Sequence, residues 1–211
     1  MSERIAVVGS GQMGNGIAHV FAVAGYDVTM IDVSSPALAK ARATIEKNLA
    51  RQVEKKTIDA PARVAALARL STNENLDAAA GAALVIEAAT ERAELKFALF
   101  ADLDRIAQPN AILASNTSSI SITEIAARTK RPAQVIGMHF MNPVPVMQLV
   151  EVIRGLATSD ATTQRVLELS RTLGKTPVEV NDYPGFVSNR VLMPMINEAI
   201  YCLMEGVGSA E

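Results

Sequence analysis

A glycine-rich turn between an apolar run and a helical pattern dominates the first part of the chain. The apolar run Ile5–Val8 leads into Gly9-Ser10-Gly11-Gln12-Met13-Gly14, after which apolar residues recur at helical spacing, at positions 17, 18, 21 and 22. A second apolar run at 26–31 ends in Asp32. This order of strand, GxGxxG turn, helix, strand and acidic residue predicts a dinucleotide-binding βαβ unit.

Each position of the turn has a physical reason. Gly9 permits the tight turn, Gly11 leaves room for the pyrophosphate, and Gly14 lets the helix pack closely. The helix N-terminus offers free N–H groups and a partial positive charge to the phosphates. We therefore expect the whole turn to bind the cofactor, through Gly9, Ser10, Gly11, Gln12, Met13 and Gly14.

Asp32 indicates which dinucleotide is bound. It lies 18 residues after Gly14, at the end of the second strand, where its carboxylate can accept hydrogen bonds from both adenosine ribose hydroxyls and repels a 2′-phosphate. The predicted cofactor is therefore NAD rather than NADP. The alternative, a glycine turn in an α/β protein that binds no nucleotide, is disfavoured because strand, spacing and acid agree.

Composition limits the remaining possibilities. The 211 residues suffice for one large domain, or for one domain and a small second one. A net charge of −2 leaves no basic surface for nucleic acid, and we find neither a signal peptide nor a membrane span. The single cysteine, Cys202, excludes an internal disulfide, suits the cytoplasm, and is expected to be a buried structural thiol.

Apolar runs alternate with helical patterns up to about residue 182, which predicts a Rossmann-type, doubly wound, mostly parallel sheet of the α/β class. The expected strands are Ile5–Val8, Asp27–Ile31, Leu70–Ser71, Ala83–Ile86, Ile112–Ala114, Val135–His139, Gln148–Ile153 and Val178–Val180. The expected helices are Met13–Ala24, Pro36–Glu54, Pro61–Ala68, Glu94–Ala107, Ile122–Ala127 and Ala161–Leu173.

The pattern changes after residue 182. Tyr183-Pro184-Gly185 breaks the chain, and one long apolar helix follows over 186–204, with Pro194 inside it. We therefore predict an NAD-binding domain at 1–182 and the incomplete start of an all-α C-terminal domain at 183–211. A helix that is apolar nearly all round requires cover, from a second subunit or from further polypeptide.

Polar residues also stand at strand ends away from the glycine turn. The Ser115–Ser119 segment follows one strand, His139 ends another, and Glu151 shares an apolar strand face with Leu149 and Ile153. A buried carboxylate requires a partner, and His139 on the neighbouring strand is the economical one, giving an oriented general acid/base. A structural role for each residue is the alternative. The other histidine, His19, is expected to face solvent or to pack locally.

Several motifs together resemble one family. They are the glycine turn, Asp32, Glu87-Ala88-Ala89-Thr90-Glu91, Ser115-Asn116-Thr117-Ser118-Ser119, His139-Phe140-Met141-Asn142-Pro143 and Pro184-Gly185-Phe186-Val187-Ser188-Asn189-Arg190. In this order and spacing the chain resembles the L-3-hydroxyacyl-CoA dehydrogenases along its whole length, most closely the 3-hydroxybutyryl-CoA branch. The resemblance implies oxidation of (S)-3-hydroxyacyl-CoA to 3-oxoacyl-CoA with NAD in fatty acid metabolism, without a metal, in a cytoplasmic homodimer.

The resemblance also implies roles for single residues. His139 matches the catalytic base, Glu151 its orienting partner, Ser118 the hydroxyl that binds the reacting oxygen, and Asn189 the amide that completes the catalytic and substrate site. Further residues match cofactor or coenzyme A contacts. Glu91, Lys96, Ser118 and Asn142 lie on the nicotinamide side, and Asn48 and Lys55, with Ser118 and Asn189, contact substrate. Arg51 and Lys56 flank Lys55, and a plain solvated helix face is the alternative for this group.

The chain departs from the family pattern at its end. Family members continue for several helices beyond Asn189, whereas this sequence stops at Glu211, so we expect a C-terminally truncated form. Two alternatives to the acyl-CoA activity stay open. One is a related β-hydroxyacid dehydrogenase acting on an acid without coenzyme A, and the other is a truncated nucleotide-binding form without turnover.

Overall fold

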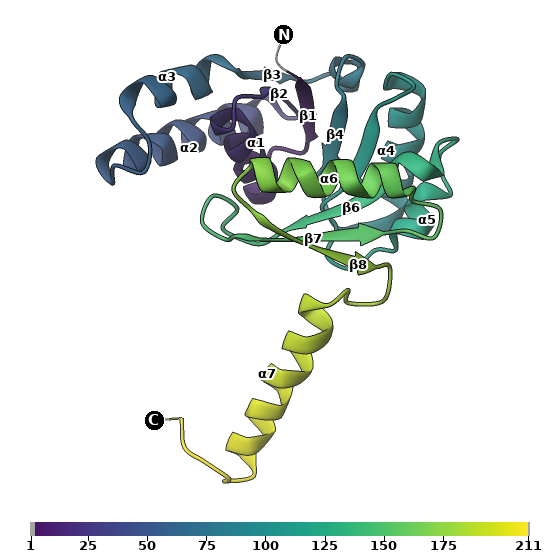
Figure 1. The fold of residues 1–211 in the computed structure, drawn as a ribbon. Helices are drawn as coiled ribbons and strands as arrows, with labels where there is room; N and C mark the ends of the chain where they lie inside the picture. Colours follow the sequence, from purple (N-terminus) through teal and green to yellow (C-terminus); the bar gives the residue numbers. More distant parts are fainter. Residues whose placement is uncertain (1–2, 211) are drawn as a thin grey trace.

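An eight-stranded sheet forms the centre of the computed structural model, which describes residues 3–210 (Figure 1). The strand order is β3-β2-β1-β4-β5-β6-β7-β8, and every neighbouring pair is parallel except β6 and β7. The strands are β1 Arg4–Val8, β2 Asp27–Ile31, β3 Leu70–Asn73, β4 Leu84–Glu87, β5 Ile112–Ser115, β6 Val135–Phe140, β7 Leu149–Arg154 and β8 Thr176–Asn181.

Helices cover both faces of the sheet. Successive residues of a strand point to opposite faces, so Ile5 and Val7 of β1 enter one hydrophobic cluster and Ala6 and Val8 the other. The first cluster packs under α1, α2, α3 and α6, and the second under α4, α5 and the short helix η1. The helices are α1 Gln12–Val23, α2 Ser35–Glu54, α3 Ala60–Ala68, α4 Ala93–Ile106, α5 Ile122–Ala126, α6 Asp160–Thr172 and α7 Ser188–Met204.

This architecture confirms the predicted doubly wound, mostly parallel sheet, and each expected strand and helix is present within one or two residues at its ends. Two short 3₁₀ helices, η1 at Leu76–Ala79 and η2 at Pro132–Gln134, were not predicted. A single turn of this kind leaves no hydrophobic periodicity to read in a sequence.

The last helix, α7, stands apart from the sheet. It extends away from the α/β body, and it contains no buried residue (Figure 1). Its apolar side chains remain exposed, among them Val191 at 62% and Met195 at 59%. The expectation that Cys202 is buried is therefore wrong for this structure, since the thiol is only half-buried. Within residues 3–210, no helix is long and apolar enough to span a bilayer.

For His19, the structure decides between the two expected alternatives in favour of local packing. Its imidazole is buried inside the α1 layer rather than facing solvent, with Nε2 3.1 Å from Oε1 of Gln52 and Nδ1 without a hydrogen-bond partner. Burial, reinforced by the charge of Lys175 and opposed by the Gln52 hydrogen bond, lowers the pKa of His19. The fold therefore favours the neutral His19 ring over the imidazolium.

Candidate active site at the carboxyl edge of the sheet

The glycine turn joins β1 to α1 at the carboxyl edge of the sheet. Gly9 has a φ of +100°, and a Cβ there would lie 2.5 Å from the carbonyl oxygen of Ala88 beyond β4. A Cβ at Gly14 would lie 1.9 Å from the carbonyl oxygen of Gly9. Both positions exclude a side chain because the helix, the turn and the loop after β4 are packed against one another.

Gly11 differs from the other two glycines, because a Cβ at this position would meet nothing within 4 Å. It borders a pocket of about 620 Å³ that also includes Asp32. The N-terminus of α1 has no side-chain cap and no acidic residue in its first turn, so its N–H groups are available to an anion. Open space at Gly11, free donors and a nearby carboxylate fit a bound dinucleotide.

Asp32 is held in place by Ser10. The backbone N–H and the hydroxyl of Ser10 donate to Oδ2 of Asp32 at 2.8 and 2.7 Å, and the N–H of Ser34 donates to Oδ1 at 3.1 Å. Burial opposes ionisation of Asp32, but these hydrogen bonds outweigh it and lower the pKa of the carboxyl. Asp32 is therefore a fixed anion at the adenosine end of the pocket.

His139 and Glu151 face each other across the antiparallel pair β6 and β7, where they are register partners. Nδ1 of His139 lies 2.8 Å from Oε2 of Glu151, and both side chains are buried. This contact fixes Nδ1 as the donor, which leaves Nε2 as the proton-accepting atom of the neutral ring. The ring of Phe186 packs against the imidazole, with 5.9 Å between ring centres.

The second oxygen of Glu151 belongs to the start of α7. The backbone N–H groups of Val187 and Ser188 donate to Oε1 at 3.0 and 2.8 Å. Burial by itself raises the pKa of Glu151. The hydrogen bonds from His139, Ser188 and Val187 together lower the pKa by more than burial raises it, so the net shift is downward. A single buried carboxylate thus orients the imidazole and anchors α7, a link that the sequence reasoning missed.

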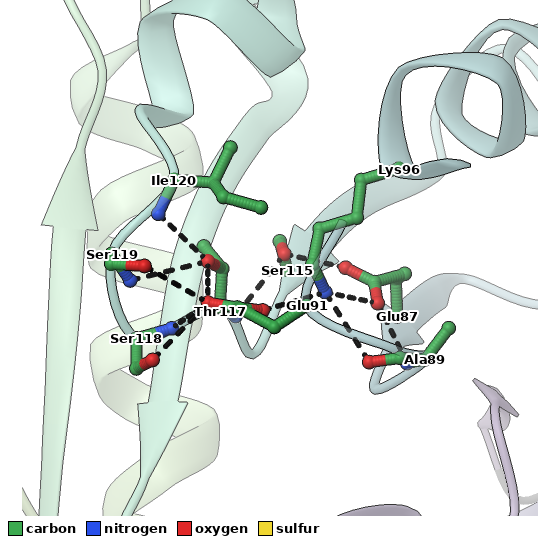
Figure 2. Close-up of polar contacts among 9 residues, drawn as sticks. All are labelled: Glu87, Ala89, Glu91, Lys96, Ser115, Thr117, Ser118, Ser119 and Ile120. Atoms are coloured by element: carbon green, nitrogen blue, oxygen red, sulfur yellow. Dashed lines mark hydrogen bonds and ion pairs between the residues drawn. The ribbon is translucent and has the colours of Figure 1, made fainter. Parts of the chain in front are cut away.

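A polar network fixes the segment after β5 (Figure 2). Oε1 of Glu91 accepts hydrogen bonds from the Thr117 hydroxyl at 2.6 Å and from the backbone N–H of Ser118 at 2.8 Å, with the Ser118 hydroxyl at 3.1 Å. The Lys96 ammonium lies 3.2 Å from Oε2 of Glu91 and 2.6 Å from Oε1 of Glu87. The Ser118 hydroxyl is thereby placed by a carboxylate that a buried lysine holds.

One pocket of about 490 Å³ brings together an imidazole, a hydroxyl, two amides and a carboxylate from the predicted site residues. These are His139, Ser118, Asn142, Asn189 and Glu91. The Asn189 side chain contacts the Ser118 carbonyl at 3.4 Å. Lys96 is not among the lining residues and lies behind Glu91, so in this structure it reaches the pocket only through that carboxylate.

A third pocket, of about 470 Å³, lies between the glycine turn, α2 and the segment 142–145. Asn48 lines it from α2, together with Lys40 and Thr44. Lys55 is exposed beyond the end of α2 and does not line it. We call this third pocket the α2 groove, and the other two the Asp32 pocket and the His139 pocket. Gly11 and Gln12 border both the Asp32 pocket and the α2 groove, and Asn142 borders both the α2 groove and the His139 pocket, so the three pockets adjoin.

Comparison with known proteins agrees with this arrangement. A family model described as "3-hydroxyacyl-CoA dehydrogenase, NAD binding domain" matches residues 4–183. The 3-hydroxybutyryl-CoA dehydrogenase of Bradyrhizobium diazoefficiens is 54% identical over 209 residues, covering 99% of this chain and 71% of its own length. That of Clostridioides difficile is 46% identical, with 99% and 74% covered. The crystal structure of (S)-3-hydroxybutyryl-CoA dehydrogenase from Ralstonia eutropha superposes with a TM-score of 0.96 at 48% identity, covering 100% of this chain and 74% of that one.

Proposed function

The chain belongs to the 3-hydroxyacyl-CoA dehydrogenase family and catalyses NAD-dependent oxidation of 3-hydroxyacyl-CoA, and we propose that 3-hydroxybutyryl-CoA is its substrate and His139 its proton acceptor. The observation that carries the assignment of His139 is its buried hydrogen bond to Glu151 beside Ser118 and Asn189. No other histidine lines this pocket among the described residues.

The roles follow from the donors and acceptors present. NAD, when bound, accepts the hydride from C3 of the substrate. Nε2 of His139 takes the proton of the 3-hydroxyl, and Glu151 stabilises the resulting imidazolium. The Asn189 amide donates to the reacting oxygen, and the Ser118 hydroxyl does so by turning its single proton away from Glu91. Glu91 then keeps Ser118 in place through the backbone N–H at 2.8 Å.

Substitution of His139 tests its role as the proton acceptor. His139→Gln should lower kcat for acetoacetyl-CoA reduction by roughly 10²-fold or more, because a positioned acid/base supplies about 10²–10⁴. NADH affinity, measured by fluorescence titration, should change little. His19→Gln is the matched control, since it alters the second histidine outside the pocket. A His139→Gln enzyme with a near-normal rate removes the imidazole from the mechanism.

We propose that the groove along α2 receives coenzyme A, with Asn48 in its wall and Lys55 at its open end. Lys55→Met should then raise KM for acetoacetyl-CoA and leave kcat unchanged, and Lys130→Met, remote from α2, should change neither. Turnover of free 3-hydroxybutyrate in preference to the thioester indicates a dehydrogenase of acids without coenzyme A. NADH binding without any turnover indicates a nucleotide-binding form.

We further propose a cytoplasmic homodimer in which a second copy covers α7, the start of a separate helical unit at 183–211. The exposed apolar side chains of α7 support the dimer, since leaving one such side chain exposed to water instead of buried costs roughly 1.5–3 kcal/mol. Light scattering at micromolar concentration should give twice the mass of the chain. A stable monomer with full activity contradicts the dimer.

A further inference from the structure

Three ionisable groups form a charge cluster that runs from the wall of the His139 pocket into the interior: Glu91, Lys96 and Glu87 (Figure 2). Glu87 ends β4 and is 0% exposed, and Lys96 on α4 is 1% exposed. Glu87 accepts three hydrogen bonds, from Lys96 at 2.6 Å, from the N–H of Ala89 at 2.7 Å and from the Ser115 hydroxyl at 2.6 Å. Three donors thus hold the Glu87 carboxylate, one of them the Lys96 ammonium.

The cluster does not neutralise itself. Two carboxylates share one ammonium, which leaves one net negative charge, and Lys96 lies closer to Glu87, at 2.6 Å, than to Glu91, at 3.2 Å. Glu87 therefore draws the ammonium back from the pocket. The uncompensated charge lies toward Glu91, whose side chain is 38% exposed and borders the same pocket as His139 and Ser118.

The dinucleotide fingerprint indicates which end of the cofactor meets this charge. Asp32 marks the adenosine pocket, and the pocket with His139 and Glu91 adjoins it, since Met13, Ala88 and Ala89 line both. The nicotinamide ring, which must reach the atoms that react, belongs at the His139 end. This placement rests on the function proposed above.

We propose that Glu87 is a positioning residue that sets the redox preference of the bound cofactor. The nicotinamide ring carries a positive charge when oxidised and none when reduced, so a net negative charge beside it stabilises NAD⁺ over NADH. Glu87 touches neither pocket, and acts by holding Lys96 so that the ammonium does not cancel Glu91. Lys96 and Glu87 are buried, which shields their contact from water, while the charge that remains on Glu91 is partly exposed and partly screened.

Glu87→Gln tests the charge with little change of shape. The glutamine carbonyl can accept from Lys96 and Ala89, and its NH₂ can donate to the Ser115 hydroxyl, so the cluster becomes neutral with its contacts kept. The ratio of Kd for NAD⁺ to Kd for NADH should rise by about 3- to 10-fold, as expected for one partly screened unit charge. NADH is titrated by fluorescence, and NAD⁺ by competition against it.

Lys96→Met is the opposing variant, because it leaves two carboxylates and no cation. The same ratio should fall, since both charges that remain beside the ring are negative. Ser115→Ala is the matched control, since it removes a hydrogen bond to Glu87 without changing the charge, and should leave the ratio unaltered. If Glu87→Gln fails to fold, Lys96→Met alone carries the test.

Opposite shifts in the two charge variants, with none in Ser115→Ala, support the proposal. If each variant weakens the binding of both cofactor forms equally, or leaves the ratio unchanged, the proposal is overturned and the cluster has a structural role. These titrations need no substrate, so they are independent of the proposed acyl-CoA activity. An unmodified chain that binds both cofactor forms but does not reduce acetoacetyl-CoA contradicts the proposed function without affecting the measured ratios.

Discussion

Glu151→Gln should inactivate the enzyme by changing the tautomer of His139 while leaving the fold intact. The two ends of the carboxylate differ, since Oε1 accepts two backbone N–H groups, from Val187 and Ser188, and Oε2 faces Nδ1 of His139. A glutamine has one carbonyl oxygen for these two ends. The structure therefore decides which way the new amide points.

The magnitude follows from counting donors. With its NH₂ toward α7, the glutamine would face two partly buried N–H donors, and an unsatisfied buried donor costs about 1–3 kcal/mol, which is the upper range for each. With its NH₂ toward His139, the glutamine faces no N–H donor, provided that Nδ1 of His139 gives up its proton and becomes the acceptor. The second arrangement is preferred, and the proton then moves to Nε2, where it prevents the ring from accepting another.

An amide that imposes the wrong tautomer on a catalytic histidine costs about 10⁴-fold in kcat in the serine-protease triad, so we expect a loss of roughly 10³–10⁴-fold here. Steady-state turnover of NADH with acetoacetyl-CoA measures the loss, and ¹⁵N NMR of the imidazole reports the tautomer. Thermal unfolding should remain near that of the unmodified protein. A kcat within about threefold of normal, or an imidazole still protonated at Nδ1, would falsify this reasoning.

Three further outcomes are expected. Asp32→Ala should weaken NADH binding and narrow its advantage over NADPH in parallel titrations, and equal use of NADPH by the unmodified protein rejects the reading of Asp32. Gly14→Ala should abolish NADH binding or folding, because its Cβ would lie 1.9 Å from the Gly9 carbonyl oxygen, and a Tm and Kd near normal contradict that packing. His19 has a folded-state pKa below its ordinary 6.5, so the unfolded chain takes up the proton first and stability falls as the pH drops below 6.5. His19→Met should remove this fall in the free energy of unfolding, measured with urea at pH 7.5 and 5.5 (roughly the two sides of the transition). The same change in the free energy of unfolding between the two pH values in the variant and the unmodified protein refutes it.

The dinucleotide-binding turn could be predicted from the sequence because its residues lie close together along the chain. Strand, glycine turn and helix adjoin in sequence, and Gly9 and Gly14 are required by contacts within one βαβ unit. The pairing of His139 with Glu151 was also accessible, since alternation places a strand residue on a definite face and the two strands are neighbours. Their catalytic roles, and those of Ser118 and Asn189, stay predictions.

Chain sequence thus determined the order of strands and helices, the dinucleotide turn and the carboxylate at Asp32, because each depends on residue spacing along one segment. Tertiary structure decided what the spacing could not encode: that Glu151 anchors the start of α7, that Glu87 draws Lys96 behind Glu91, and that His19 is buried. These outcomes depend on which side chains from distant segments meet in a low-dielectric interior, where each buried polar group must find its partner in space.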